Sequence, residues 1–165
     1  MKNALLLPVL FLLTTYSSLG QQKWQTYTSA VGKYTIQMPA NADVKHSASD
    51  AELTTEKLEI KDGDILYVAS VTIHETELTE SDELEKVSLE SFTETVGGTL
   101  LSQTAWKVKK REGIMATIEL KEGIIIYYRV LIDGNRQFQV VAVTEVTSKA
   151  NSKFINKYFK SFKPE

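Results

Sequence analysis

The chain has 165 residues, of which 24% are charged, and its formal net charge is −2. A charge so close to balance gives no overall basic field that would attract nucleic acid or anionic lipid. The sequence contains no cysteine, which excludes disulfides and thiol chemistry.

The first twenty residues have the pattern of a secretory signal peptide. Lys2 is followed by an apolar run at residues 4–13 and by a polar stretch that ends in small residues at Gly20. This run is too short to cross a bilayer, which needs about 20 apolar residues in a helix. We therefore expect residues 1–20 to be cleaved on export to the periplasm or the exterior. Residues 21–165 should then form one domain with no transmembrane segment.

The next segments have the composition of β-strands. A strand is predicted at residues 34–38, where Pro39 stops it. A long hairpin is predicted across residues 51–74, with its turn at the "DGD" of residues 62–64. Its second arm, residues 66–73, is rich in the β-branched and aromatic residues that favour strands.

The hydrophobic period then changes to that of a helix. Leu89, Phe92 and Val96 recur at helical spacing, and acidic residues precede them at the expected helix start near Ser81. The "GG" of residues 97–98 supplies a left-handed stop. An exposed amphipathic helix of about fourteen residues is predicted.

Residues 99–145 are predicted to form four strands joined by three-residue loops at 111–113, 121–123 and 133–135. In this register Trp106 and Val108 share an apolar face with Ile118 and Ala116, and the opposite face is mixed. The third strand, "IIIYYRVLI", is apolar on both sides, so something should cover part of the mixed face.

The final segment, residues 148–162, is predicted to be a second helix and is the candidate cover. Its apolar residues fall within one helical arc and are expected to pack in the core: Phe154, Ile155, Tyr158, Phe159 and Phe162. The predicted fold class is α+β, an antiparallel meander sheet with helices packed on its faces as an α/β/α sandwich.

The order of these segments resembles the PsbP-like fold superfamily, and most of all its small secreted bacterial members. The resemblance rests on the strand that enters Pro39, on "GGTLLSQ" after the first helix, and on the terminal "FINKYFKSF". It implies an antiparallel sheet between helices and a role in non-covalent docking to larger assemblies. It provides no functional residue that can be carried onto this sequence, and a fold alone says little about function.

Catalytic and metal-binding motifs are not evident. His46 and His74 lie far apart without the spacing of metal ligands, and no nucleophile motif is present. The paired carboxylates sit beside glycines, as in turns. We expect no enzyme activity, no metal and no cofactor.

The cationic stretch "WKVKKREG", residues 106–113, is the nearest thing to a functional motif. The predicted register turns two of its lysines toward the mixed face, where they would form a shallow polar groove for an acidic partner segment or a small anionic ligand. The groove residues are Lys107, Lys109, Tyr127, Arg129 and Gln139. The alternative is a solvated edge strand whose lysines prevent aggregation.

The sequence thus favours a non-enzymatic exported protein that docks to another envelope or secreted protein, with no nucleic acid partner. The alternative is a carrier of a small apolar or anionic ligand. Its cavity would lie between sheet and helix and be lined by Tyr127, Tyr128 and Trp106.

Overall fold

The computed structural model describes residues 23–39, 43–49, 53–145 and 147–165. The predicted signal peptide, residues 1–20, lies outside the described residues, so its removal stays a prediction.

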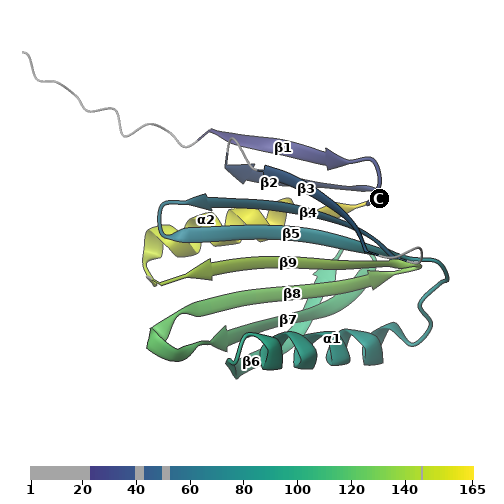
Figure 1. Ribbon diagram of the computed structural model, residues 1–165. Helices are drawn as coiled ribbons and strands as arrows, with labels where there is room; N and C mark the ends of the chain where they lie inside the picture. The colour runs from purple at the N-terminus through teal and green to yellow at the C-terminus, as the bar shows by residue number, and fades with distance from the viewer. Residues whose placement is uncertain (1–22, 40–42, 50–52, 146) are drawn as a thin grey trace, which may run out of the picture.

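A seven-stranded antiparallel sheet forms the centre of the molecule, in the order β3-β4-β5-β9-β8-β7-β6 (Figure 1). Its strands are β3 (Asp43–Ser49), β4 (Leu53–Asp62), β5 (Ile65–His74), β6 (Thr99–Val108), β7 (Arg111–Glu119), β8 (Ile125–Asp133) and β9 (Arg136–Thr144). The predicted antiparallel meander is confirmed, and the turn of the β4–β5 hairpin lies at Gly63, as predicted.

A second, three-stranded antiparallel sheet consists of β1 (Trp24–Ser29), β2 (Tyr34–Pro39) and β10 (Lys163–Pro164). β2 lies between the other two strands, so the two ends of the described chain meet there.

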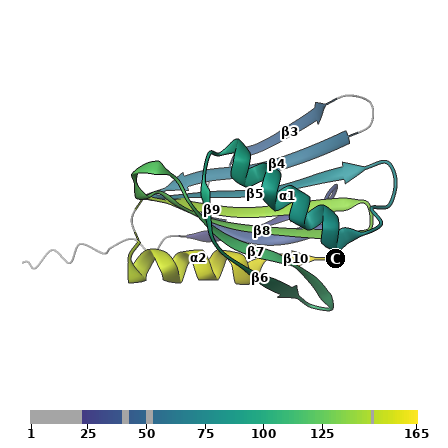
Figure 2. The same cartoon turned by 90° about the horizontal axis from the view of Figure 1, so that it is seen from below.

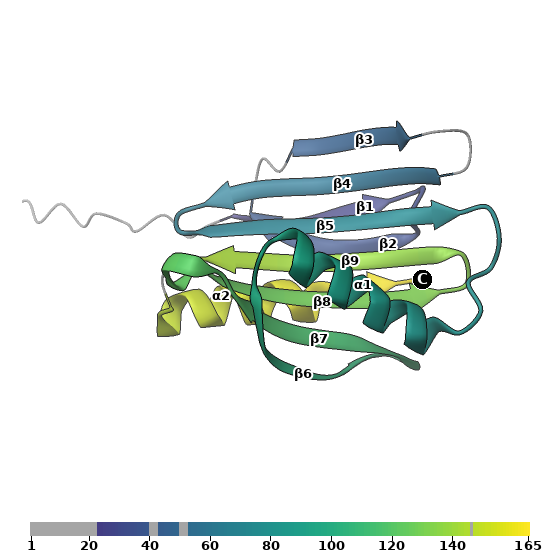
Figure 3. The same cartoon turned by 60° about the horizontal axis from the view of Figure 1, so that its bottom comes forward.

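Two helices cover opposite faces of the large sheet: α1 (Ser81–Thr95) and α2 (Lys149–Ser161). Figure 3 shows α1 in front of the sheet and α2 behind it. Gly97, with a φ of 64°, ends α1, and the side chain of Ser148 caps α2 by accepting a hydrogen bond from the Asn151 amide at 3.1 Å. The α+β sandwich expected from the sequence is confirmed.

The core on the α2 side is aromatic. Tyr158 of α2 is fully buried, and its hydroxyl donates a hydrogen bond of 2.7 Å to the carbonyl oxygen of Val68 on β5. Tyr67, Phe138 and Phe162 lie in the same cluster. The predicted stripe of α2 is therefore core, and it covers the face that the sequence left open.

The core on the α1 side is mostly aliphatic, and Leu89 is the residue of α1 that is buried in it. It also contains a polar contact set under the helix. Ser88 accepts hydrogen bonds from Gln137 at 2.7 Å and Gln139 at 3.3 Å, and its hydroxyl lies 3.2 Å from that of Tyr128.

Two of the three predicted loops are wrong. The loop 121–123 is present, and Ile118 pairs with Ile126 as expected. The β6–β7 and β8–β9 hairpins instead have two-residue loops, at residues 109–110 and 134–135. Such loops suit the right-handed twist of paired strands, and Lys109 adopts the positive φ that the turn requires.

Each of these one-residue differences moves a strand's side chains to the opposite face. Trp106 therefore pairs with Gly113 and shares its face with Met115 and Arg129, not with Ile118. For the same reason Val140, directly opposite Arg129, lies on the α2 side.

Candidate functional site

The structure does not place the five predicted groove residues on one face of the sheet. Tyr127 and Arg129 lie on the α2 side of the sheet, because they pair with Ala142 and Val140 of that core. Lys107 and Gln139 belong to the other face, and Lys109 sits in the β6–β7 turn. The shared mixed face that the sequence predicted is therefore wrong.

Three of the five have partners that explain them structurally. Lys107 is 79% exposed and lies 3.7 Å from Glu112, a weak surface ion pair. Lys109 donates a hydrogen bond of 2.6 Å to the carbonyl oxygen of Pro164. Gln139 belongs to the polar contact set under α1.

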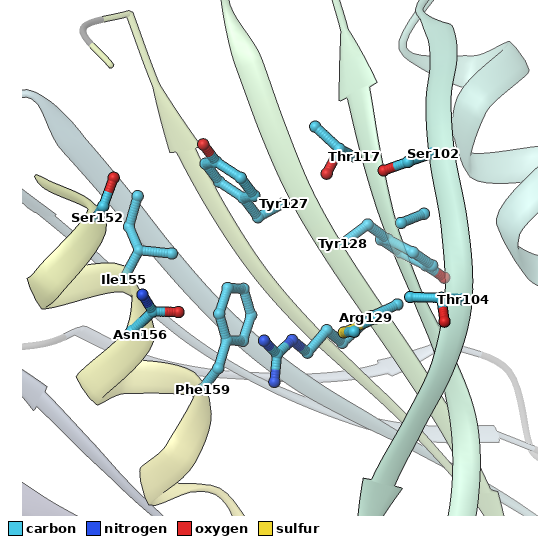
Figure 4. Close-up of a pocket in the computed structure, with 12 residues that line it drawn as sticks. Ser102, Thr104, Thr117, Tyr127, Tyr128, Arg129, Ser152, Ile155, Asn156 and Phe159 are labelled. Carbon is cyan, nitrogen blue, oxygen red and sulfur yellow. The ribbon is translucent and has the colours of Figure 1, made fainter. Parts of the chain in front are cut away.

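A half-open hollow of about 200 Å³ lies between the large sheet and α2 (Figure 4). Strands β6, β7 and β8 form one wall and α2 the other. Its lining residues are Ser102, Thr104, Met115, Ala116, Thr117, Tyr127, Tyr128, Arg129, Ser152, Ile155, Asn156 and Phe159. The observed β6 register adds Ser102 and Thr104 to this lining. Thr117, Tyr127 and Arg129 share the face beneath α2 in the predicted register as well.

Arg129 is the one charged residue in this lining. Its guanidinium carbon lies 3.9 Å from the centre of the Phe159 ring and 5.3 Å from that of Trp106. Burial lowers the pKa of its guanidinium to about 10, which leaves it charged at neutral pH. Among the described residues, no hydrogen bond or ion pair reaches its side chain.

A second, larger groove of about 540 Å³ continues from the hollow along β6 and the end of α2. Figure 2 shows β6 curving toward α2 and β10 on this side. The two spaces share Met115, Arg129, Asn156 and Phe159, and Lys107 and Lys109 line the groove rather than the hollow. Three of the predicted cations thus border one connected space, although they do not share a face.

The basic surface of α2 was missed by the sequence argument. Lys149, Lys153, Lys157 and Lys160 are all exposed and recur along one side of the helix. Together with exposed Lys163 they make up what we call the α2 basic face. This basic surface could have been predicted from the sequence, because residues 146–164 contain no acidic residue.

Within the described ranges, neither helix is long and apolar enough to cross a membrane. The same ranges hold no group of three or more potential metal ligands in a suitable cluster.

Comparison with known proteins identifies the fold. No protein-family model and no curated protein sequence matches the chain. The solution structure of cyanobacterial PsbP (CyanoP) from Synechocystis sp. PCC 6803 matches with a TM-score of 0.61 and 7% identity, over 93% of this chain and 99% of that one. A crystal structure from Bacteroides thetaiotaomicron gives a TM-score of 0.43 and 8% identity, over 86% and 48% of the two chains. The first match, which spans nearly the whole of both chains, shows that this chain has a PsbP-like fold.

Proposed function

We propose that this chain is an exported, non-enzymatic protein that docks to an acidic surface of another envelope or secreted protein. The α2 basic face makes the contact. The observation that carries the proposal is the unbalanced row of lysines on the exposed side of α2.

The charge distribution supports docking of an acidic partner. Lysines that repeat along one side of a helix, with no acid between them, produce a local positive potential even in a chain whose net charge is −2. Such a patch accelerates encounter with a negatively charged surface and selects against basic partners.

The opposite side of the molecule has the reverse charge. α1 contains five acidic residues and one lysine, and it covers the other face of the sheet. A partner attracted to α2 is therefore repelled by α1, which gives the docking an orientation.

The chemistry of the hollow supports a non-enzymatic role. Its described lining offers hydroxyls, amides and one guanidinium, and no carboxylate or imidazole. General acid–base catalysis usually needs such a group within reach of the reacting atoms. The docking role that the resemblance to the PsbP-like fold implies points the same way.

Site-specific photo-crosslinking in the cells that make the protein tests this function. A photo-reactive residue in place of Lys157 on α2 should capture a defined partner, and the same residue in place of Glu90 on α1 should not. The charge reversal K149E/K153E should abolish the adduct because it removes the positive potential. K61E/K121E, which changes the net charge equally at exposed sites elsewhere, should keep it.

Two results would oppose docking through α2. One is an adduct that forms equally from Glu90; the other is an adduct that survives K149E/K153E. An adduct that weakens as salt shortens the Debye length below about 8 Å would agree with an electrostatic interface.

A second candidate function is the carriage of a small ligand. The observation that favours it is the hollow between the sheet and α2, which Tyr127 and Tyr128 line, whereas Trp106 lines the neighbouring groove.

A further inference from the structure

We infer that the hollow between β6–β8 and α2 binds a small organic monocarboxylate and that Arg129 is the residue that holds it. This inference rests on the second candidate function, ligand carriage, and is independent of docking through the α2 basic face.

The guanidinium of Arg129 is positioned by aromatic rings. Phe159 of α2 and Trp106 of β6 both lie near it, as Figure 4 shows for Phe159. These rings interact with its cationic face and contribute no hydrogen-bond acceptor in its plane. The rings hold the group in place and leave its N–H donors available.

Those donors have no acceptor within the described part of the chain. A guanidinium has five N–H donors in a rigid fork, and where the protein offers no acceptor, water or a bound anion accepts from them. Two parallel N–H groups match the two oxygens of a carboxylate, which is the strongest common partner for arginine. An anion with this geometry would complete the site.

The remaining lining describes the body of the ligand. Met115, Ile155 and Phe159 provide an apolar surface, and Thr117 and Asn156 add hydrogen-bonding groups. A volume of about 200 Å³ equals that of roughly seven water molecules in the liquid. The ligand is therefore smaller than the drug-sized molecules that fill pockets of about 300–1,000 Å³.

The charge of the hollow favours a monoanion. Arg129 supplies one positive charge there, and the lysines of the connected groove lie outside the hollow. A phosphate carries about −1.5 to −2 charges at neutral pH and needs more cations or amide donors to replace its water. A carboxylate with a short aliphatic or aromatic body fits both the charge and the walls.

Benzoate is a suitable probe, with benzamide as its neutral counterpart of the same shape. In a ¹⁵N-resolved NMR titration of the purified protein, benzoate should give saturable shifts of the Trp106 indole and the Asn156 side-chain amide. Benzamide should bind at least tenfold more weakly. R129Q should weaken benzoate binding at least tenfold, and R129K should give an intermediate loss because it keeps the charge and loses the fork.

A second variant keeps the test decisive if R129Q does not fold. T117F fills the hollow from β7 and leaves Arg129 in place, so it should also abolish the benzoate shifts. The proposal is overturned if benzoate causes no saturable shift, if benzamide binds equally well, or if R129Q and T117F bind like the wild type. It is equally overturned if inorganic phosphate gives Arg129-dependent saturation and benzoate does not.

The charge reversal K149E/K153E separates this proposal from docking. It should leave benzoate binding unchanged within twofold while it removes the crosslinked adduct. R129Q should do the opposite.

Discussion

Glu85 shows how one residue couples the fold to pH. It lies in α1, is 2% exposed, and accepts a hydrogen bond of 2.8 Å from the Ile132 amide of β8. Burial raises the pKa of its carboxyl to about 7, the negative charges of Asp82 and Glu112 add to this, and the Ile132 hydrogen bond opposes it.

The sign of the pH effect follows from this raised pKa. Between pH 4.5 and about 7 the folded protein binds more protons at Glu85 than the unfolded chain does. The contribution of Glu85 therefore lowers the free energy of unfolding as pH rises through this window, by at most roughly 3 kcal/mol. E85Q keeps an oxygen acceptor for Ile132 and removes the charge, so it should abolish this contribution.

Urea denaturation at pH 5, 6, 7 and 8 measures the contribution of Glu85 to the free energy of unfolding. The difference in unfolding free energy between E85Q and the wild type should grow in favour of E85Q as pH rises, and should level off above pH 7. A difference that is independent of pH would show that Glu85 does not titrate in this range. E83Q, at an exposed position on the same helix, serves as the control.

Predictions about single residues were correct where the sequence pattern behind them lies within one segment of the chain. The aromatic stripe of α2 was predicted because its period is visible in one segment. Arg111 was assigned to a loop and instead lies in β7, where it pairs with Asp133 at 2.8 Å and with the carbonyl oxygen of Glu165 at 2.6 Å. Those partners are distant in sequence, and no local pattern indicates them.

At the level of elements, the helices were easier to predict than the hairpins. A helix has its cap, period and stop within one stretch, whereas a hairpin register depends on one residue of loop length. The sequence therefore placed Tyr127 and Arg129 together correctly, because both lie on β8. It misplaced Lys107 and Gln139 because an incorrect loop length separates each from β8.

The length of the β6–β7 loop decides whether Gly113 lies in a turn or within a strand. The sequence assigned it to a turn, but it lies within β7, where an added Cβ would sit 2.3 Å from the carbonyl oxygen of Val130. G113N should therefore lower the free energy of unfolding by more than about 2 kcal/mol, since neighbouring backbone must move.

Gly134 is the matched control. It is a true turn residue with a φ of 63° and no atom within 4 Å of an added Cβ. Asparagine tolerates this conformation, so G134N should cost less than about 1 kcal/mol. Chemical denaturation of both variants decides the point, and equal losses would favour the turn role for Gly113.

The whole molecule has an uneven charge distribution that its net charge conceals. α2 and α1 carry opposite charge on opposite faces of one sheet. The composition gives a formal net charge of −2, which correctly excludes an overall basic field. Composition alone could not show that the lysines gather on one side of the molecule. Gathering depends on which faces the helices cover, a property of the tertiary fold.

This polarity predicts chromatographic behaviour. At pH 7 and low salt the protein should be retained on a sulfonate cation exchanger despite its negative net charge, because the α2 basic face binds the resin. K149E/K153E should elute much earlier than the wild type. K61E/K121E should elute close to it, and equal shifts for the two variants would mean that net charge alone governs retention.

The position of β2 between β1 and β10 sets the order in which the molecule can form. The Gln37 amide donates to the Ser161 hydroxyl at 2.9 Å across 124 residues of chain. At about 5–20 residues per second, a ribosome needs roughly 6–25 s to synthesise the chain between them. Until then β2 lacks β10 and α2, the aromatic core stays open, and contacts of such long range are slow to form. We therefore expect a newly made chain to complete its aromatic core only seconds after β2 has been synthesised.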